Sequence, residues 1–578
     1  MAKVQKEDQR VIVTKSGTYV ETNEGREKVC NFIISIAEEV QHIAEDGTVS
    51  KKVKLKVKYK GKLIEFFLTY DAFIDLKWIP IYIDFEAYVD YKVKSKTQFI
   101  SLIIQLSKNR FQRTLVNKCG YYQHGDELCY LHNGGALRGD GTNNELIKAN
   151  VTGALSKNFI PSLTENDNHV NLVNDFIDLQ YISRTNPLIG TLLFAIITRA
   201  PLTDLILIEV VLGLVGETGV FKTATGILSQ QCNGPELKEP ICNWTSTAKS
   251  IELTLQQACN MVVITDDYTP GHQNRQTEEI VELIFGGVGN STVRNIKVSP
   301  TENANAPLIE AVPLITAEII PPMTQSRKER SIFVKIEKGD VDTNTLTKNQ
   351  DIAKSGGFAK VNGLYICYRL ANNDEIKESI DKVFNFYRTK AYEILGDGYH
   401  KRAPSNVADL MLGIHYFANF CVKNDYISND KEQELVSYSF NNIIALVKLQ
   451  PIIHEAVDFQ VFIKSELSTF FRSTLTMKDF STISNMDAKS YAGKMIGWRD
   501  VENKKFYIAV DSSEIIYQKL PEHLKTILKC GPKSFWAKLK KNKLLVEWDK
   551  SNKKNYIRKS FNKKNYCLYS LDYSLIID

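Results

Sequence analysis

Apolar residues along this chain recur with the two-residue period of strands in its first part. Strand patterns lie at residues 11–13, 53–59 and 63–70 and again near Tyr121 and Tyr130. A helical period follows the first three of these, at residues 99–107. Together these elements predict an accessory α+β domain over residues 1–150.

Helical spacing takes over further along the chain. Residues 168–200 predict buried helices that lead into a hydrophobic strand at 205–215. Helical patterns at 376–394 and 406–422 predict a helical, lid-like domain over residues 341–457, and the polar run 340–357 has the composition of a linker. The intervening residues 151–340 are expected to form an α/β core, so the fold class is multidomain α/β.

The last part of the chain has short elements and many lysines. Two helices are expected at residues 520–528 and 532–541, and two strands at 544–548 and 566–570. Helices followed by a β-hairpin are the order of a winged helix, which we expect within residues 458–578.

Composition narrows the class of protein. Of the 578 residues 43% are hydrophobic and 24% charged, which is typical of a multidomain globular protein. The most apolar stretch, 188–215, is interrupted by Arg199, Pro201, Asp204 and Glu209, so no membrane span is expected. The N-terminus is polar and lacks an export signal, which predicts a cytoplasmic protein.

Cysteine usage agrees with a reducing compartment. The ten cysteines are scattered, without the close pairs of a zinc knuckle, and reduced thiols are expected. His124 and His132 lie near Cys119 and Cys129, but the irregular spacing favours packed strand residues over a zinc site.

A phosphate-binding loop is predicted where the strand at 205–215 ends. The segment GETGVFKTA offers backbone N–H groups at a helix N-terminus, a lysine for terminal phosphates and a hydroxyl for Mg²⁺. Phe221 replaces the usual second glycine, and an incidental Lys-Thr pair is the alternative. The expected ATP-binding residues are Gly216, Glu217, Thr218, Gly219, Val220, Phe221, Lys222, Thr223 and Ala224.

Two carboxylates follow the next apolar strand, at Asp266 and Asp267. In P-loop ATPases this strand end presents one acid to the metal and the other to the attacking water. We therefore expect Thr223 and Asp266 to hold Mg²⁺ and Asp267 to activate water. Adjacent acids at a strand end also occur for purely structural reasons, and the distance after the P-loop favours the catalytic interpretation.

Further polar residues follow at two more strands. The strand at 311–315 ends in Thr316 and Glu318, and Arg327 and Arg330 stand directly before an apolar strand. An arginine placed there can stabilise charge on a transferring phosphoryl group, often across a subunit boundary. A solvated ion pair is the alternative for either arginine.

These four elements occur in the order that is found in AAA+ ATPases. The runs NWTSTAKSIELTLQQACNMVVITDDYTPG, FGGVGNSTVRNIKV and PLITAEIIPPMTQSRKERSIFVKI resemble AAA+ helicase-like proteins of plasmids, prophages and cassette-type mobile elements. That group includes self-loading replicative helicases related to the mini-chromosome-maintenance type. The resemblance implies a non-glycine before the P-loop lysine, as at Phe221, and a phosphate-sensing role for Thr316.

The resemblance also implies contacts with DNA. In similar helicases a hairpin between the metal strand and the sensor strand grips the nucleic-acid backbone, which makes Arg294 and Lys297 candidates. The basic C-terminal unit, with Lys538, Lys540 and Lys541 among aromatics, fits duplex DNA. For both segments a solvated, charged surface is the alternative.

The sequence therefore predicts an ATP-dependent DNA helicase that serves replication of a mobile element. We expect a homohexameric ring on single-stranded DNA, duplex contacts by the winged helix, and primase or polymerase partners. One alternative is an AAA+ ATPase that remodels proteins or acts in defence. Another is a DNA-binding initiator that uses ATP as a switch.

Overall fold

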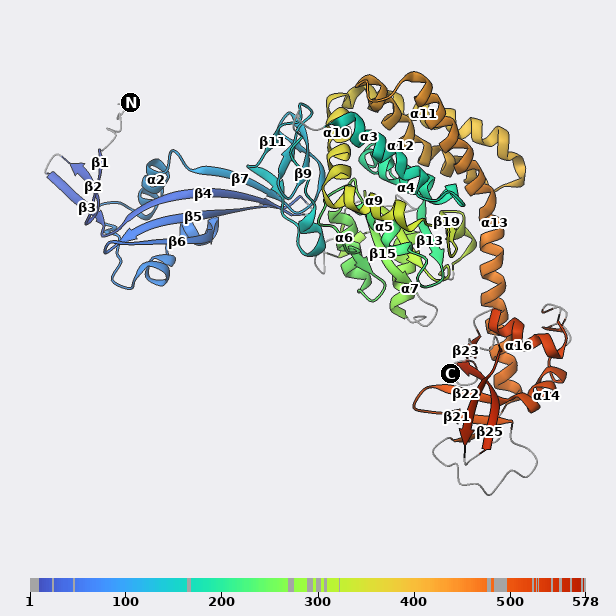
Figure 1. The fold of residues 1–578 in the computed structure, drawn as a ribbon. Coiled ribbons are helices and arrows are strands. Elements are labelled where there is room, and N and C mark those ends of the chain that lie inside the picture. Colours follow the sequence, from blue (N-terminus) through green and yellow to red (C-terminus); the bar gives the residue numbers. More distant parts are fainter. Residues whose placement is uncertain are drawn as a thin grey trace. The chain divides into compact units, whose positions relative to one another are not determined.

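The structure is a computed structural model of the chain (Figure 1). It describes residues 10–22, 25–44, 47–163, 168–268, 275–287, 295–297, 303–305, 309–321, 323–475, 480–482, 496–521, 524–525, 528, 530–541, 544–549, 554–561, 564–572 and 575. The chain divides into two compact units, Met1–Gln450 and Pro451–Asp578.

The first 150 residues are rich in strands. In the described part these form sheets with the orders β1-β2-β3, β12-β7-β4-β5-β6 and β11-β10-β9-β8. The strands are β1 (Val11–Thr14), β2 (Gly17–Thr22), β3 (Gly25–Cys30), β4 (Ile33–Ile43), β5 (Val49–Tyr59), β6 (Lys62–Thr69), β7 (Phe111–Val116), β8 (Gly120–His124), β9 (Glu127–His132), β10 (Gly135–Leu137), β11 (Asn143–Asn144) and β12 (Ile147–Ala149). The strands predicted at 53–59 and 63–70 are confirmed by β5 and β6.

Two helices accompany these sheets, α1 (Tyr70–Asp75) and α2 (Lys96–Leu106). Ser95 begins α2 with a capping box, in which its side chain and that of Gln98 each accept a backbone N–H. Phe99, Leu102 and Ile103 of α2 are buried in one core with the inward residues of β4, β5 and β6. The helix predicted at 99–107 is therefore confirmed.

A parallel sheet lies at the centre of the first unit. Its order is β14-β15-β18-β13-β19, and every neighbouring pair is parallel. The strands are β13 (Val211–Gly216), β14 (Cys242–Asn243), β15 (Val262–Tyr268), β18 (Val312–Ala317) and β19 (Ser331–Ile336). All-parallel sheets are buried on both faces, which agrees with the nearly complete burial of β13 and β18.

Helices cover this sheet (Figure 1). The helices with the most contacts to its strands are α4 (Pro187–Arg199), α5 (Lys222–Gln231) and α8 (Gln325–Lys328). The same region also contains α3 (His169–Ile177), α6 (Ala248–Gln257) and α7 (Arg275–Val281). The strand predicted at 205–215 begins only at Val211. The N–H groups of Leu205 and Ile206 both donate to Leu202 O, so the chain is still turning after α4.

The region after β19 is helical, as expected. Its helices are α9 (Thr343–Lys354), α10 (Gly357–Ala371), α11 (Asn373–Leu395), α12 (Ala403–Lys423) and α13 (Asn429–Thr474), which crosses the unit boundary. The interpretation of 340–357 as a linker is wrong. Asp342 caps α9 by accepting from Thr345 N at 2.8 Å, and Leu346 and Ala353 supply a buried face on an otherwise polar helix.

The second unit combines helices and an antiparallel-rich sheet. Among its described residues the sheet order is β20-β21-β22-β25-β23, with β24 paired to β25. Its elements are β20 (Phe480–Thr482), β21 (Gly497–Asp500), β22 (Lys505–Ala509), α14 (Ser513–Gln518), α16 (Pro532–Lys541), β23 (Leu545–Glu547), β24 (Ile557–Phe561) and β25 (Lys564–Asp572). Trp536 stacks on Tyr569 with ring centroids 4.1 Å apart, which joins α16 to the sheet.

This sheet is larger than the two-stranded wing that the sequence predicts. The helix expected at 532–541 and the strands at 544–548 and 566–570 correspond to α16, β23 and β25. Strand β24 lies in the basic segment that was expected to be a loop. Ile557, which pairs with Leu568, packs against the cluster of Trp498, Tyr507 and Leu568.

Two expectations from composition can be compared with the structure. The apolar stretch at 188–215 contains most of α4, and in the described part of the chain no helix is both long enough and apolar enough to cross a membrane. All ten cysteines, each within the described ranges, are free thiols.

Candidate nucleotide-binding site

The loop after β13 joins the parallel sheet to α5 and contains two glycines whose positions restrict it. A Cβ at Gly216 would lie 2.2 Å from Ile336 O, so only glycine fits where this loop passes the end of β19. Gly219 has a φ of +84°, in the left-handed region. Helix α5 starts directly after the loop, at Lys222, and the N–H groups of its first turn have no partner within the helix. Such a helix N-terminus attracts anions.

Phe221 is the residue that precedes α5. Its φ of +69° and ψ of 21° are left-handed values, which a glycine adopts easily and an aromatic residue rarely does. The side chain is 43% exposed and so is not held there by burial in the core. The loop therefore keeps the backbone shape of the glycine motif without its second glycine.

Lys222 lies along this loop and is buried. Its Nζ donates to Gly216 O and to Glu217 O, both at 2.9 Å. The ammonium group is thus held by two loop carbonyls at the place where the loop curves around the start of α5. A group in this position can exchange carbonyl partners for phosphate oxygens.

Three side chains converge next to the lysine, two from neighbouring strands and one from the start of α5. Asp266 Oδ1 accepts from Thr223 Oγ1 at 2.8 Å and also accepts a hydrogen bond from Thr316 Oγ1. Asp266 lies near the end of β15, Thr316 lies near the end of β18, and Thr223 lies in the first turn of α5, which follows β13, so all three lie at the carboxyl edge of the parallel sheet. Ligands bind at this edge in open α/β sheets. A carboxylate and a hydroxyl are oxygen donors of the kind that Mg²⁺ prefers, so the residues fit this metal.

Asp267 differs from Asp266 in conformation. Its φ is +68°, and the pairing of β15 with β18 shifts register between Thr265 and Tyr268. The backbone N–H of Asp267 donates to Thr316 Oγ1 at 3.0 Å, and its side chain is exposed. The bulge therefore leaves Asp266 turned toward Thr223 and Asp267 accessible to solvent.

Glu318, which the sequence places with Thr316 after the third strand, belongs to the same edge. Its carboxylate accepts a hydrogen bond from Thr218 Oγ1 in the loop, and its N–H donates to Tyr268 O at 2.9 Å. Its position two residues after Thr316 was the available signal, because an extended chain projects alternate residues to the same side.

The two candidate arginines are not brought to this loop. Arg330 O accepts from Val211 N at 2.8 Å, so Arg330 lies at the amino edge of the sheet, beside the first residue of β13. Gly216 is five residues further along β13, about 17 Å at the rise of a strand. Burial lowers the pKa of Arg330, and the nearby Arg402 lowers it further. Arg327 forms an ion pair with Glu282.

The candidate DNA contacts are described only in part. Arg294 lies outside the described residues, and Lys297 ends β16 (Asn295–Lys297), which pairs antiparallel with β17 (Asn303–Asn305). In the second unit Lys538 and Lys540 lie on α16, and Lys540 Nζ is 5.2 Å from the centroid of the Trp548 ring. Lys541 ends α16, and its side chain lies outside the described part.

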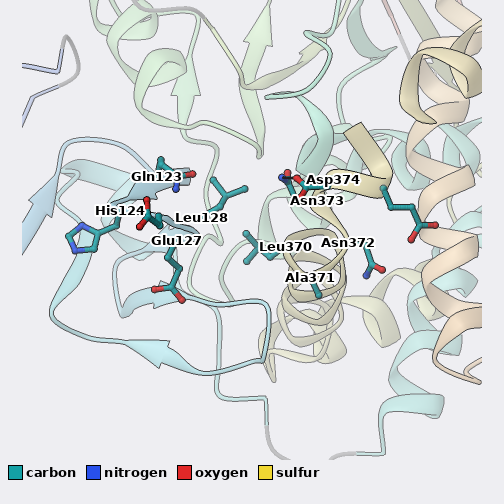
Figure 2. A pocket seen from close by; sticks show the side chains of 11 residues that line it. Gln123, His124, Glu127, Leu128, Leu370, Ala371, Asn372, Asn373 and Asp374 are labelled. Carbon is teal, nitrogen blue, oxygen red and sulfur yellow. Dashed lines mark hydrogen bonds between the residues drawn. The ribbon is translucent and has the colours of Figure 1, made fainter. Parts of the chain in front are cut away.

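A pocket of about 840 Å³ lies elsewhere in the first unit (Figure 2). It is bounded by the β8–β9 hairpin and by the junction of α10 and α11. Four carboxylates line it, namely Asp126, Glu127, Asp374 and Glu375. Because these acids would repel phosphates, the pocket does not suit a nucleotide.

Comparisons with known proteins give similarity of overall structure only. No protein-family model matches the chain, and no curated protein matches it in sequence. The chain is similar to a structure described as "SCCmec type IV Cch - active helicase", with 12% identity over 98% of both chains and a TM-score of 0.47. It is also similar to the NrS-1 C-terminal region, with 11% identity over 71% of this chain and 87% of that one and a TM-score of 0.25. At these values neither likeness carries an argument about the activity of this chain.

Proposed function

We propose that this protein is an ATP-driven DNA helicase of the AAA+ type. The observation that supports it most is the convergence of Thr223, Asp266 and Thr316 beside the buried Lys222, at the carboxyl edge of a parallel sheet. This edge combines a helix N-terminus, a cation and oxygen donors within one small region. Those are the parts that phosphoryl transfer to water requires.

Each residue has a distinct role in this proposal. Lys222 Nζ leaves its two loop carbonyls for terminal phosphate oxygens, and the first turn of α5 offers its N–H groups to the same phosphates. Thr223 and Asp266 hold Mg²⁺, which neutralises phosphate charge when bound. Asp267, exposed beside Asp266, orients the attacking water, and Thr316 senses the terminal phosphate while it fixes both acids.

An arginine from another subunit completes the site in this proposal. Arg330 is separated from its own P-loop by about the length of β13, which is too far for a side chain to span. A neighbouring copy could present Arg330, or alternatively Arg327, to the nucleotide. This favours a closed ring of identical subunits, which we propose is a hexamer.

The proposed substrate is DNA. Arg294 and Lys297 would track one strand through the ring, and the basic second unit, proposed to be a winged helix, would contact duplex DNA through Lys538, Lys540 and Lys541. Electrostatic contacts of this kind are independent of sequence, as translocation requires. A role in replication of a mobile element, with primase or polymerase partners, completes the proposal.

Steady-state ATP hydrolysis by the purified protein tests the proposal, with and without single-stranded DNA, in low and moderate salt. We expect turnover that DNA stimulates and that salt suppresses. Lys222→Ala should lower turnover at least about a hundredfold, because transition-state charge loses its nearest cation. The control Lys249→Ala alters an exposed lysine on α6 and should leave turnover unchanged.

Other outcomes would favour the other functions. Turnover that is indifferent to DNA would overturn the helicase proposal in favour of protein remodelling. Nucleotide binding without turnover, in the presence of DNA, would indicate a switch. If Lys222→Ala hydrolysed ATP as fast as the parent, the assignment of the site itself would be wrong.

A further inference from the structure

The outward face of β5 carries a row of lysines. Along this strand Val53, Leu55, Val57 and Tyr59 point into the core, and the residues between them point to the other side. Those outward residues are Lys52, Lys54, Lys56 and Lys58. Because a strand repeats every two residues, their Cα atoms follow one another at about 6.7 Å in a straight line.

Aromatic rings flank this row on the same side of the sheet. Lys54 pairs with Phe67 on β6 and with Glu38 on β4, and Glu38 pairs with Phe111 on β7. Paired residues share a face, so these four side chains form one line across four strands. Phe67 is 52% exposed and Phe111 69%. Two open rings thus stand about 14 Å apart, with Lys54 Nζ 5.9 Å from the Phe67 centroid.

The charge on this face is predominantly positive. Two carboxylates lie on it, and each forms an ion pair. Glu65 forms one with Lys54 at 2.8 Å, and Glu38 forms one with Arg113 at 3.2 Å. Lys52, Lys56 and Lys58 are exposed and form no ion pair within the part of the chain that the structure describes. After the pairs are formed, a positive excess of three lysines remains beside the two rings.

Exposed rings and unpaired cations on one face are informative together. Singly exposed apolar side chains are common on folded domains, so what distinguishes this face is that two exposed rings share it with a row of lysines. Lysines attract the phosphates of a nucleic acid. An exposed aromatic ring offers a stacking surface to a base that is not already stacked within a double helix. Duplex DNA keeps its bases stacked internally and would use only the lysines. The combination therefore fits an unpaired strand.

We propose that the outward face of β7, β4, β5 and β6 binds single-stranded nucleic acid without sequence preference. Bases stack on Phe67 and Phe111, and Lys52, Lys56 and Lys58 lie against the phosphates. This surface lies in the first 150 residues, whose role the sequence left open, and it needs no nucleotide hydrolysis. It would hold a strand whether or not the P-loop site drives movement.

Binding of a fluorescent oligothymidylate to the full-length protein tests this surface, in the Lys222→Ala background so that ATP hydrolysis has no part. Phe67→Ala/Phe111→Ala should weaken binding about tenfold or more. Lys52→Ala/Lys56→Ala/Lys58→Ala should lower the slope of log affinity against log salt by about 2. The control Lys382→Ala/Phe386→Ala changes a comparable exposed pair on α11, where Phe386 is 59% exposed, and should bind as the parent does.

A second measurement separates this surface from other DNA contacts. An oligothymidylate that carries 5-iodouracil, irradiated on the full-length protein, should form adducts at Phe67 or Phe111. Adducts confined to residues outside 33–116 would overturn the proposal, as would unchanged affinity in both multiple variants. Binding of anionic phospholipid vesicles that both variants abolish, with oligothymidylate binding intact, would overturn it in favour of a membrane surface.

Discussion

Phe221 holds a left-handed backbone conformation at the entrance to α5, and this is testable. A non-glycine residue there costs roughly 1 kcal/mol, and a β-branched residue costs more. We expect Phe221→Gly to keep ATP affinity, because glycine adopts the same loop conformation. Its stability should change little, since relief of the strain offsets the greater freedom of glycine in the unfolded chain. Phe221→Val should weaken ATP binding about tenfold and lower the thermal midpoint. Isothermal titration with a non-hydrolysable ATP analogue measures the affinities of the two variants, and thermal denaturation measures their midpoints. Equal affinities would contradict the argument.

His132 predicts a pH dependence of local stability. Gly134 N donates to its Nδ1 at 3.2 Å, so Nε2 carries the proton and donates to Asn143 Oδ1 at 3.1 Å. Burial lowers the pKa of His132 to about 4. Between that value and about 6.5 the unfolded chain binds a proton that the folded chain does not, so stability falls as the pH falls through this window.

The stability that the neutral His132 contributes is fully present above about pH 6.5, and roughly 3 kcal/mol of it is lost near pH 4. Hydrogen exchange of the β9 amides, corrected for intrinsic rates, should report this loss between pH 7 and 4.5. His132→Gln should flatten the profile, whereas His124→Gln, which alters an exposed ring, should keep it. A parent profile that is already flat would refute the assignment.

Local pattern located the site residues better than it located their partners. A strand, a glycine turn and a helix are set by nearby residues, so the positions of Lys222 and Thr223 at a helix start and of Asp266 near a strand end could be predicted. The contact of Thr218 with Glu318 joins residues 100 positions apart and depends on sheet order. No single-sequence pattern reports that order, nor the bulge that turns Asp267 outward.

Element boundaries show where composition misleads. Helix α9 looks like a linker because its exposed side is polar, and only the burial of Leu346 and Ala353 reveals its inward side. Strand β24 was missed because polar and charged residues, Arg558, Lys559 and Ser560, fill its centre. The start of β13 was predicted at residue 205 instead of Val211, because the apolar residues between α4 and β13 lie in a turn. In each case tertiary packing decided what local composition could not.

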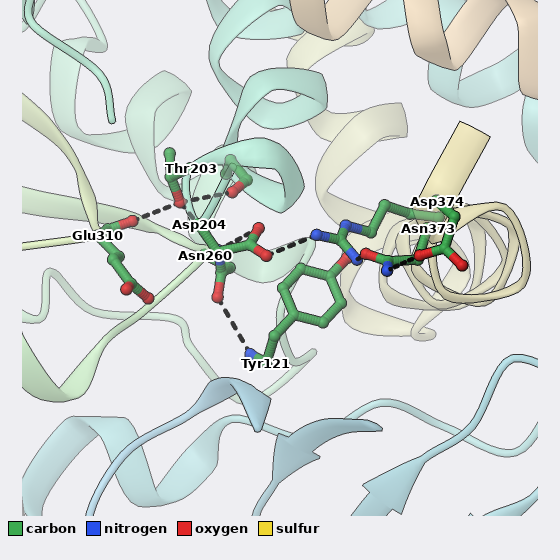
Figure 3. Close-up of polar contacts among 9 residues, drawn as sticks. Tyr121, Thr203, Asp204, Asn260, Glu310, Asn373 and Asp374 are labelled. Carbon is green, nitrogen blue, oxygen red and sulfur yellow. Dashed lines mark hydrogen bonds and ion pairs between the residues drawn. The ribbon is translucent and has the colours of Figure 1, made fainter. Parts of the chain in front are cut away.

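A buried polar cluster joins β8 to the elements around the central sheet (Figure 3). Arg369, fully buried on α10, forms an ion pair with Asp204 at 2.5 Å and lies 4.2 Å from the centroid of the Tyr121 ring. Asn260 Oδ1 accepts from Tyr121 N at 3.1 Å, and its Nδ2 donates to Asp204 Oδ1 at 3.3 Å. The cluster built around this charge pair therefore links four separate segments of the chain.

Arg369→Leu should destabilise the first unit by about 3–5 kcal/mol, because the Asp204 carboxylate would stay buried without its partner. Arg369→Leu/Asp204→Asn should recover most of this loss, since no net charge then remains in the cluster. Thermal denaturation of both variants measures the difference. If the double variant were less stable than Arg369→Leu alone, the pair would not be the source of the effect.

In the proposed ring, Arg330 is separated from the loop after β13 of its own subunit, so it could act on a nucleotide only in the neighbouring subunit. Two edges of one sheet, about 17 Å apart, carry the phosphate cradle and the arginine. Head-to-tail contacts in a ring would bring the amino edge of one copy toward the carboxyl edge of the next. Neither Lys222→Ala nor Arg330→Ala subunits alone would then form a complete site.

Mixing the two inactive variants tests this arrangement. In rings assembled from equal amounts of Lys222→Ala and Arg330→Ala subunits, about a quarter of the interfaces would join an intact Lys222 to an intact Arg330. Turnover should therefore reappear on mixing, although each variant alone is reduced at least about a hundredfold. Arg327→Ala in place of Arg330→Ala identifies which arginine acts. If mixed rings form and remain inactive with both arginine variants, the arginine does not act across the interface, and hydrolysis must depend on groups within one subunit.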